Sequence, residues 1–218
     1  MVIAIDGPSG AGKGTVARAV ARMLKCSYVD TGAMYRAVAW KACHEGRSLE
    51  DESAVSEVAG GAVFDLSESH VIIDGHDVTR AIRTPDMDRA AATVSRMPAV
   101  REVLVSHQRR YAREATVVME GRDIGTVVFP DAAVKIYLEA SPEERAARRA
   151  SDPAHQRSAG DGLAEVASAL EARDRSDRTR QVSPLMRASD AALIDTTGLP
   201  VAEVVNRVMA VVRERVGS

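Results

Sequence analysis

The chain has 218 residues, a formal net charge of −2 at pH 7, 45% hydrophobic residues and 28% charged residues. This length suits one sizeable domain with small insertions, and the composition is typical of a soluble globular protein. The near-neutral charge argues against a general nucleic-acid binder, and the lack of an apolar run of about 18 residues argues against a membrane span. The two cysteines form no CxxC pair and no basic region precedes the first apolar run, so we expect a cytoplasmic protein without a signal peptide.

Short apolar runs alternate along the chain with stretches in which apolar residues recur at helical spacing. The apolar runs predict buried strands at 2–6, 28–30, 116–120, 133–140 and 192–195. Helical spacing predicts helices at 13–24, 33–45, 49–59, 142–150 and 201–215. Strands that alternate with helices predict an α/β fold with a central parallel sheet of five strands.

Two regions interrupt this alternation. Residues 63–79 contain VIIDGHDV, in which two β-rich pieces flank Asp74-Gly75, a strong hairpin signal. We therefore expect a small antiparallel β-containing insert at about 60–97. Residues 151–162 are rich in polar and turn-forming residues between two helices, which predicts a long loop or flap.

The stretch GPSGAGKGT at 7–15 lies between the first predicted strand and the first predicted helix. Gly7-x4-Gly12-Lys13 in this context is the P-loop pattern, because glycines let backbone N–H groups converge on phosphates and Lys13 reaches the β- and γ-phosphates. An ordinary glycine-rich turn is the alternative, which the flanking strand and helix disfavour. The general pattern places Ser or Thr directly after the lysine, but here Gly14 precedes Thr15. This variant is seen in many nucleoside monophosphate kinases, and it leaves open whether Thr15 contacts Mg²⁺ directly or through water.

P-loop proteins include switches, motors and kinases. A GTPase switch needs an NKxD-type guanine reader, but the single asparagine, Asn206, is followed by Arg207. Nothing in the chain is repeated or large enough to suggest a motor. The remaining class transfers phosphate to a small acceptor.

Charged residues follow the second and third predicted strands. In YVDTGAMYR (28–36), Arg36 comes about one helical turn after the strand, where it can hold a phosphate; a solvated helix arginine is the alternative. Glu120 ends the third strand, where an acid can lie near Mg²⁺. Arg122 and Asp123 follow in a short glycine-flanked loop, for which a salt bridge within the turn is the alternative.

A third charged stretch is ARDRSDRTR at 172–180, after an amphipathic helical segment. Arg173, Asp177 and Arg180 share one face at helical spacing. That face could meet a nucleotide in a cleft, or it could belong to an exposed charged helix.

The motifs together resemble the bacterial cytidylate kinase family. GPSGAGKGT, YVDTGAMYR, EGRDIGTVVFPDA, SPEERAARR and RDRSDR occur in the order and spacing of that family, with the insert around 63–83 between them. The resemblance runs from about Val2 to Arg213. It implies a single P-loop three-layer domain over 1–218, a nucleoside-monophosphate-binding insert at about 60–97 and a lid at about 150–162. It also implies the reaction of ATP with CMP or dCMP in pyrimidine nucleotide metabolism, a requirement for Mg²⁺, and a monomer that binds neither nucleic acid nor membrane.

The resemblance assigns roles residue by residue. The residues expected to bind ATP are Gly7, Pro8, Ser9, Gly10, Ala11, Gly12, Lys13, Gly14, Thr15 and Arg149. The residues expected to bind the acceptor are Thr31, Arg101 and Asp123 at the cytosine, Arg36, Arg122 and Arg180 at the phosphate, and Arg173 and Asp177 at the sugar. The catalytic charges are expected to be Lys13, Arg122 and Arg180, and the residues expected near Mg²⁺, directly or through water, are Thr15 and Glu120. The lid candidates, among which the sequence does not choose, are Arg145, Arg148 and Arg149.

Two positions depart from the family pattern, because serine is common at the position of Thr31 and some relatives have aspartate at the position of Glu120. Cytosine carries an exocyclic amine that Asp123 can accept, whereas uracil presents an oxygen there, so a preference for CMP over UMP follows. Two alternatives stay open. One is a P-loop kinase of another small acceptor such as UMP, AMP or a shikimate-like alcohol, and the other is a nucleotide-binding regulator that transfers nothing.

Overall fold

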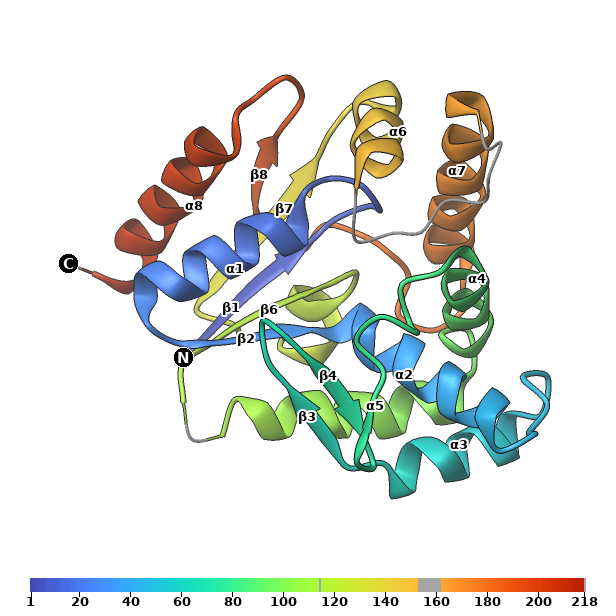
Figure 1. Cartoon of the computed structure of the whole chain (residues 1–218). Coiled ribbons are helices and arrows are strands. Elements are labelled where there is room, and N and C mark those ends of the chain that lie inside the picture. Colours follow the sequence, from blue (N-terminus) through green and yellow to red (C-terminus); the bar gives the residue numbers. More distant parts are fainter. Residues whose placement is uncertain (114, 153–161, 218) are drawn as a thin grey trace.

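A five-stranded sheet forms the centre of the fold, and all of its strand pairs are parallel (Figure 1). The computed structural model describes residues 1–113, 115–152 and 162–217. Across the sheet the strands run in the order β2 (Ser27–Asp30), β6 (Val117–Gly121), β1 (Val2–Asp6), β7 (Val134–Glu139) and β8 (Ala192–Asp195). All five strands predicted from the apolar runs are therefore confirmed, with shifts of one or two residues at their ends.

Helices cover both faces of this sheet. The helical elements of the described residues are α1 (Lys13–Leu24), α2 (Thr31–His44), α3 (Glu52–Gly61), α4 (Pro85–Val94), α5 (Pro98–Tyr111), the π-helical turn η1 (Ile124–Val128), α6 (Pro142–Ser151), α7 (Leu163–Thr179) and α8 (Val201–Val216). Within the described part of the chain, no helix has the length and apolar character needed to cross a lipid bilayer.

Short-range capping explains where several helices begin. Asp30 caps α2 by accepting a hydrogen bond from the Ala33 backbone N–H (2.9 Å), so the helix starts at Thr31, earlier than its apolar spacing predicts. Ser141 caps α6 in the same way, with a proline at the first helical position. Helix α4 was not predicted, because its inward face is built mainly of alanines, which give a weak apolar pattern.

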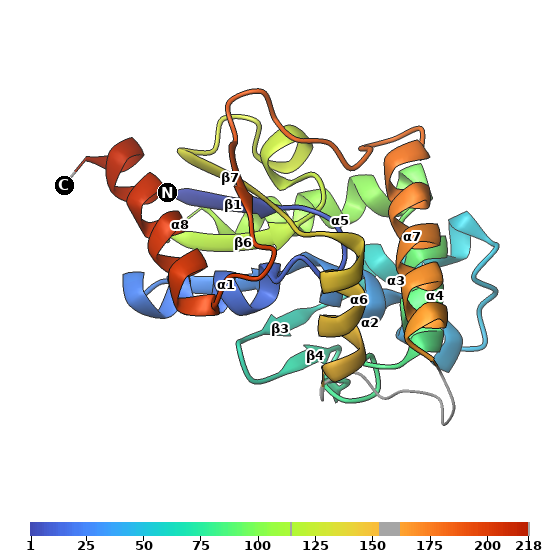
Figure 2. The same ribbon diagram turned by 90° about the horizontal axis from the view of Figure 1, so that it is seen from above.

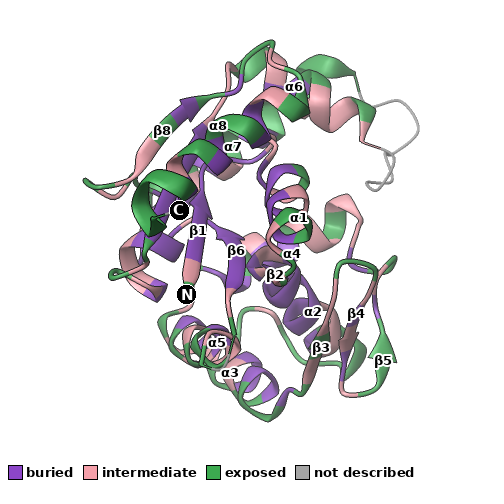
Figure 3. Ribbon diagram, turned by 90° about the vertical axis from the view of Figure 1, so that its left-hand side faces the viewer, coloured by how far each residue is buried: buried purple, intermediate pink, exposed green. Residues whose placement is uncertain are grey.

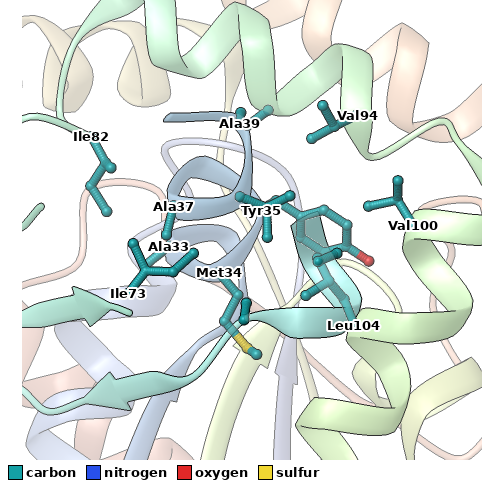
Figure 4. Packing of buried hydrophobic residues seen from close by; sticks show 14 of the residues in the cluster. Ala33, Met34, Tyr35, Ala37, Ala39, Ile73, Ile82, Val94, Val100 and Leu104 are labelled. Atoms are coloured by element: carbon teal, nitrogen blue, oxygen red, sulfur yellow. The ribbon is translucent and has the colours of Figure 1, made fainter. Parts of the chain in front are cut away.

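Two hydrophobic cores lie on opposite faces of the sheet because side chains alternate along each strand. On β1, Ile3 and Ile5 pack into a core closed by α1 and α8, whereas Ala4 faces the core formed with α2 to α5. Figure 3 shows the buried strands at the centre of the molecule. In the second core, Tyr35 of α2 lies beside Val100 and Leu104 of α5 (Figure 4).

The predicted hairpin insert is present as a three-stranded antiparallel sheet of β3 (Phe64–Leu66), β4 (Val71–Ile73) and β5 (His76–Asp77). Asp74 (φ 48°) and Gly75 (φ 80°) connect β4 to β5. Both have the positive φ that a tight two-residue hairpin turn requires, which is why Asp-Gly signals it so strongly. Most of the predicted flap, residues 153–161, lies outside the described residues.

A small aromatic group joins α2 to this insert. The ring of Trp40 stacks on His44 with 4.8 Å between ring centroids, and His76 lies 5.7 Å from Trp40 and 5.5 Å from His44. Helix α2 is therefore in direct contact with the end of the hairpin through this group.

Candidate active site

The carboxyl ends of the strands open onto a cleft of about 1090 Å³. Figure 2 shows α6 and α7 beside one another at this end of the sheet. The volume exceeds the range of about 300–1,000 Å³ that is usual for one small ligand, so the cleft has room for two. Nearly all of the predicted site residues line it, namely Ser9, Gly10, Ala11, Gly12, Lys13, Gly14, Thr15, Thr31, Arg36, Arg101, Glu120, Arg122, Asp123, Arg149, Arg173, Asp177 and Arg180. Gly7 and Pro8 do not line it.

The P-loop glycines adopt backbone conformations that other residues rarely adopt. Gly7 has φ 146°, and a Cβ there would lie 2.0 Å from the carbonyl oxygen of Leu138 on β7. Gly12 caps α1 with φ 87° and provides no side chain to satisfy the first amides of the helix. These amides face the cleft end of α1, where the helix dipole also favours an anion.

Lys13 is buried at the base of this loop, with 6% of its surface exposed. Its Nζ donates a hydrogen bond to the carbonyl oxygen of Pro8 (2.7 Å). Burial and, to a lesser extent, the nearby Arg122 guanidinium lower the pKa of the Lys13 ammonium group to about 7, against the opposing effect of Glu120. A phosphate placed beside Lys13 would restore the charge of the lysine.

Side chains of α6 and α7 form hydrogen bonds with the backbone of the P-loop at Ser9. The Ser9 backbone N–H donates to Asp174 Oδ1 (3.1 Å), and Arg145 contacts Asp174 and donates to the Ser9 carbonyl oxygen (3.0 Å). Arg145 does not line the cleft, so of the three lid candidates only Arg148 and Arg149 face it. Asp174 was not foreseen, because it lies among the charges of α7 with no motif to distinguish it.

The far end of the cleft is built around the acceptor loop, which we define as residues 121–125. The Asp123 carboxylate is buried and contacts the Arg101 guanidinium, and Arg180 Nη2 lies 3.5 Å from Asp123 Oδ1. Arg122 Nε donates to Asp177 Oδ2 on α7 (3.0 Å). A salt bridge within the turn is therefore the wrong interpretation of Arg122 and Asp123, because each pairs with a distant residue.

Thr31 lies beside this loop, where its hydroxyl donates to the backbone carbonyl oxygen of Glu120 (2.7 Å). Tyr35 also lines the cleft, with the Arg101 guanidinium 5.4 Å from its ring centre. Sequence reasoning assigned no role to Tyr35, because its spacing on α2 matches that of a core residue.

Three arginines of the cleft converge on one carboxylate that the motifs do not reveal. Asp88 of α4 contacts Arg149, accepts a hydrogen bond from Arg173 Nη1 (3.1 Å) and lies 3.9 Å from Arg36 Nη1. Arg36 also donates to Asp30 (3.0 Å) and is only 7% exposed, so it is not a solvated helix arginine. The charged face of α7 likewise turns into the cleft rather than into solvent.

Glu120 lies at the carboxyl end of β6, between the P-loop and the acceptor loop. Tyr28 donates a hydrogen bond to Glu120 Oε1 (2.6 Å). Burial raises the pKa of the Glu120 carboxyl, and the neighbouring Asp30 adds to this effect. A Cβ on Gly14 would lie 2.7 Å from Glu120 Oε1, so the glycine after Lys13 leaves room for this carboxylate.

No cluster of three or more metal-ligating side chains is present in the described ranges 1–113, 115–152 and 162–217. Thr15 and Glu120 nevertheless place a hydroxyl and a carboxylate on the same cleft. Such oxygen donors suit Mg²⁺, which proteins usually bind through one or two side chains together with substrate phosphates. The donor set therefore fits an ion that arrives with a nucleotide.

Solved structures of low sequence identity share this fold. A gluconokinase from Sinorhizobium meliloti superimposes with a TM-score of 0.53 at 16% identity, covering 98% of this chain and 93% of that chain. A shikimate kinase from Acinetobacter baumannii, in complex with shikimate, gives a TM-score of 0.50 at 15% identity, covering 100% and 95%.

Comparison of amino-acid sequences identifies the family more specifically than the shared fold does. The family model described as "Cytidylate kinase" matches residues 3–214. A cytidylate kinase of Desulfitobacterium hafniense is 49% identical over 98% of this chain and 93% of its own, and one of Desulforamulus reducens is 50% identical over 95% and 94%. A cytidylate kinase of Rhodococcus jostii is 47% identical over 100% of this chain and 97% of its own. With its P-loop, acceptor loop and charged α7 face lining one cleft, the chain belongs to the cytidylate kinase family.

Proposed function

We propose that the chain transfers the γ-phosphoryl group of ATP to CMP or dCMP, giving ADP and CDP or dCDP, in pyrimidine nucleotide metabolism. One observation supports this proposal most strongly. A single cleft has the P-loop at one end and, at the other, a buried carboxylate, Asp123, that is held between Arg101 and Arg180. The first feature suits a nucleoside triphosphate, and the second suits a base that carries an amine.

We assign the donor half of the cleft to ATP. Residues 9–15 of the P-loop surround the phosphates with backbone N–H groups, Gly7 and Pro8 lead the chain into the loop, and Lys13 neutralises the β- and γ-phosphates. Arg149, at the end of α6, faces the cleft from the side of the proposed lid at about 150–162. Thr15 and Glu120 hold Mg²⁺, directly or through water, and the ion supplies further neutralisation of the phosphate charge.

We assign the acceptor half to the nucleoside monophosphate. Asp123 accepts the cytosine amine, with Thr31 and Arg101 beside the base. Arg36, Arg122 and Arg180 hold the acceptor phosphate, and Arg173 and Asp177 hold the sugar. The insert at about 60–97 closes over this half through α4, whose Asp88 already contacts arginines of the other elements.

The transfer itself needs no strong protein base. The second pKa of a phosphate monoester is about 6, so the acceptor oxygen is largely ionised near pH 7. The obstacle is the repulsion between two anionic phosphates that must approach in line. Lys13, Arg122 and Arg180 lower this repulsion, and catalysis is mainly positioning and charge neutralisation.

We further propose that the chain is a monomer of the cytoplasm that binds neither nucleic acid nor membranes, in keeping with its net charge of −2.

An ADP-release assay with CMP, dCMP, UMP, AMP and shikimate as separate acceptors, and with none, tests the function. We expect fastest turnover with CMP or dCMP and little ADP release without an acceptor. Faster turnover with another acceptor would contradict the assigned specificity. No acceptor-dependent ADP release at all would instead favour a nucleotide-binding regulator.

A further inference from the structure

A carboxylate that the mechanism does not use lies at the carboxyl end of β1. Asp6 is 5% exposed and directly precedes the P-loop. Its Oδ1 accepts a hydrogen bond from the backbone N–H of Ile124 (2.8 Å), and its Oδ2 accepts one from the backbone N–H of Gly125 (2.8 Å). A side chain from the strand that carries the P-loop therefore holds two consecutive amides of the acceptor loop.

These two amides open η1, so Asp6 acts as the cap of that helical turn. Asp123 occupies the position before the turn, from which an aspartate usually accepts an N–H of the first turn. Asp123 makes no such cap. Its carboxylate instead contacts Arg101 and approaches Arg180. Because Asp6 satisfies the two amides, the Asp123 carboxylate is free to face the cleft.

The local geometry requires close approach and has an electrostatic cost. A Cβ on Gly125 would lie 3.4 Å from Asp6 Oδ2 and 3.2 Å from the Lys135 side chain, so the glycine allows the contact. Burial, with a smaller contribution from the nearby Asp123 charge, raises the pKa of Asp6 to about 6, against the effect of the two amides and of Lys13. The ionised, buried Asp6 carboxylate therefore lowers the stability of the fold. Residues that are kept for function often have such a cost in stability.

We propose that Asp6 is a positioning residue that fixes the turn at 123–125 so that Asp123 faces the acceptor base, and that ties this turn to the P-loop strand. The inference rests on the proposed function, in which Asp123 reads the base. Asp6 itself touches neither nucleotide, because it does not line the cleft.

The Asp6→Asn variant tests this role, because asparagine keeps the shape but offers one acceptor oxygen, so one of the two amides faces an NH₂ group. We expect kcat/KM for CMP to fall about 10- to 100-fold, with the preference for CMP over UMP falling alongside it. We expect KM for ATP to stay within about twofold of the wild-type value. Asp6→Ser, which also keeps one acceptor oxygen, is assayed in parallel.

Asp195→Asn is the matched control. Asp195 also ends a strand of the sheet, and its carboxylate accepts the backbone N–H of Thr197 (2.9 Å), but it is exposed and outside the cleft. This variant should leave the kinetics with ATP and CMP unchanged.

A double-mutant cycle of Asp6→Asn with Asp123→Asn tests whether Asp6 acts through Asp123. If Asp6 acts through Asp123, its substitution has little further effect on CMP use once Asp123 is replaced.

Three outcomes would overturn the proposal: equal losses for ATP and CMP, additive effects in the cycle, or failure of both Asp6 variants to fold when Asp195→Asn folds. Wild-type protein is assayed with CMP, UMP and AMP alongside. A wild-type preference for another acceptor would contradict the proposed function, whereas the three outcomes above contradict only the role of Asp6.

Discussion

The Lys13 ammonium group lies at a site that stabilises its positive charge poorly when no nucleotide is bound. Its ammonium group is buried, its pKa is lowered to about 7 by that burial and by Arg122, and one hydrogen bond to a carbonyl oxygen holds it. The position is favourable only when an anion arrives. Function and stability therefore oppose one another at this residue.

For Lys13→Met we expect kcat/KM to fall by about 10²- to 10³-fold, because one charge-neutralising donor is lost from the transferred phosphate. We also expect the free energy of unfolding at pH 7 to rise, because a desolvated cation is replaced by an apolar side chain. ADP release and urea unfolding measure the two effects. Lys41→Met is the control, since Lys41 pairs with Asp74 outside the cleft, and we expect lower stability with unchanged activity. If Lys13→Met were as destabilising as Lys41→Met, the electrostatic argument would be wrong.

The Asp123 side chain should matter for the use of CMP but not for the binding of ATP. We expect Asp123→Ala to reduce kcat/KM for CMP by about 10- to 100-fold, because the base amine loses its acceptor and Arg101 and Arg180 lose their shared anion. The dissociation constant for ATP, measured by calorimetry, should change little. An equal loss of ATP affinity would contradict the assignment of Asp123 to the acceptor half.

Motifs in the sequence predict which residues line the cleft, but not how those residues pair. Gly12 and Lys13 follow from the spacing of the motif, whereas the partner of Arg122 is 55 positions away on α7. Asp88 and Asp6 are ordinary acids in the sequence. Only the packing of α4 against α7, and of β1 against η1, gives these two carboxylates their partners.

At the level of elements, the start of α1 is shaped by the strand end opposite it. Gly14 lies in the first turn of α1, where a glycine usually weakens a helix by about 1 kcal/mol relative to alanine. Here a Cβ would collide with the Glu120 carboxylate. The glycine that departs from the general P-loop pattern is therefore explained by a neighbour that no local pattern reveals.

We expect Gly14→Ala to displace Glu120 from Tyr28 and to raise the Mg²⁺ concentration needed for half-maximal activity by several-fold. A titration of ADP release with Mg²⁺ measures this shift. Gly60→Ala is the matched control, because Gly60 lies in α3 with nothing within 4 Å of its added Cβ. That variant should gain roughly 0.5–1 kcal/mol of stability without altered Mg²⁺ dependence. An unchanged Mg²⁺ requirement in Gly14→Ala would argue against a metal role for Glu120.

A helix or strand can be predicted from the sequence when its apolar residues form a clear pattern. Buried parallel strands are short continuous apolar runs, so all five are evident in the sequence. Helix α4 presents mainly alanines to the core, which give a weak apolar pattern, and its packing against α2 is not evident from its own sequence. The antiparallel insert is evident at Asp74-Gly75, because an Asp-Gly pair between two β-rich pieces is a strong hairpin signal.

For the whole molecule, Asp6 makes stability depend on pH. Its folded-state pKa of about 6 exceeds the ordinary aspartate value of 3.8, so between these values the native state binds more protons than the unfolded state. The contribution of Asp6 to the free energy of unfolding therefore falls as pH rises through this window, by roughly 3 kcal/mol in full.

Urea unfolding of wild type and Asp6→Asn from pH 4.5 to 7 tests this linkage. The difference in unfolding free energy should shift in favour of the asparagine variant as pH rises, because asparagine does not ionise. Asp195→Asn should show no such trend in this range, since the hydrogen bond from the Thr197 side chain lowers the pKa of Asp195 below its ordinary value of 3.8 and its carboxylate stays ionised in both states. A difference for Asp6→Asn that is constant across the range would contradict the raised pKa.

The group formed by Trp40, His44 and His76 has a practical consequence for the whole molecule. The chain contains a single tryptophan, and it lies on the helix that begins at Thr31 and carries Arg36. Its indole stacks against one imidazole of the same helix and approaches another on the hairpin of the insert. Any movement of the hairpin against α2 changes the surroundings of the only indole fluorophore. The protein thus contains its own optical reporter: if acceptor binding moves the hairpin against α2, we expect the indole emission to change without an attached dye.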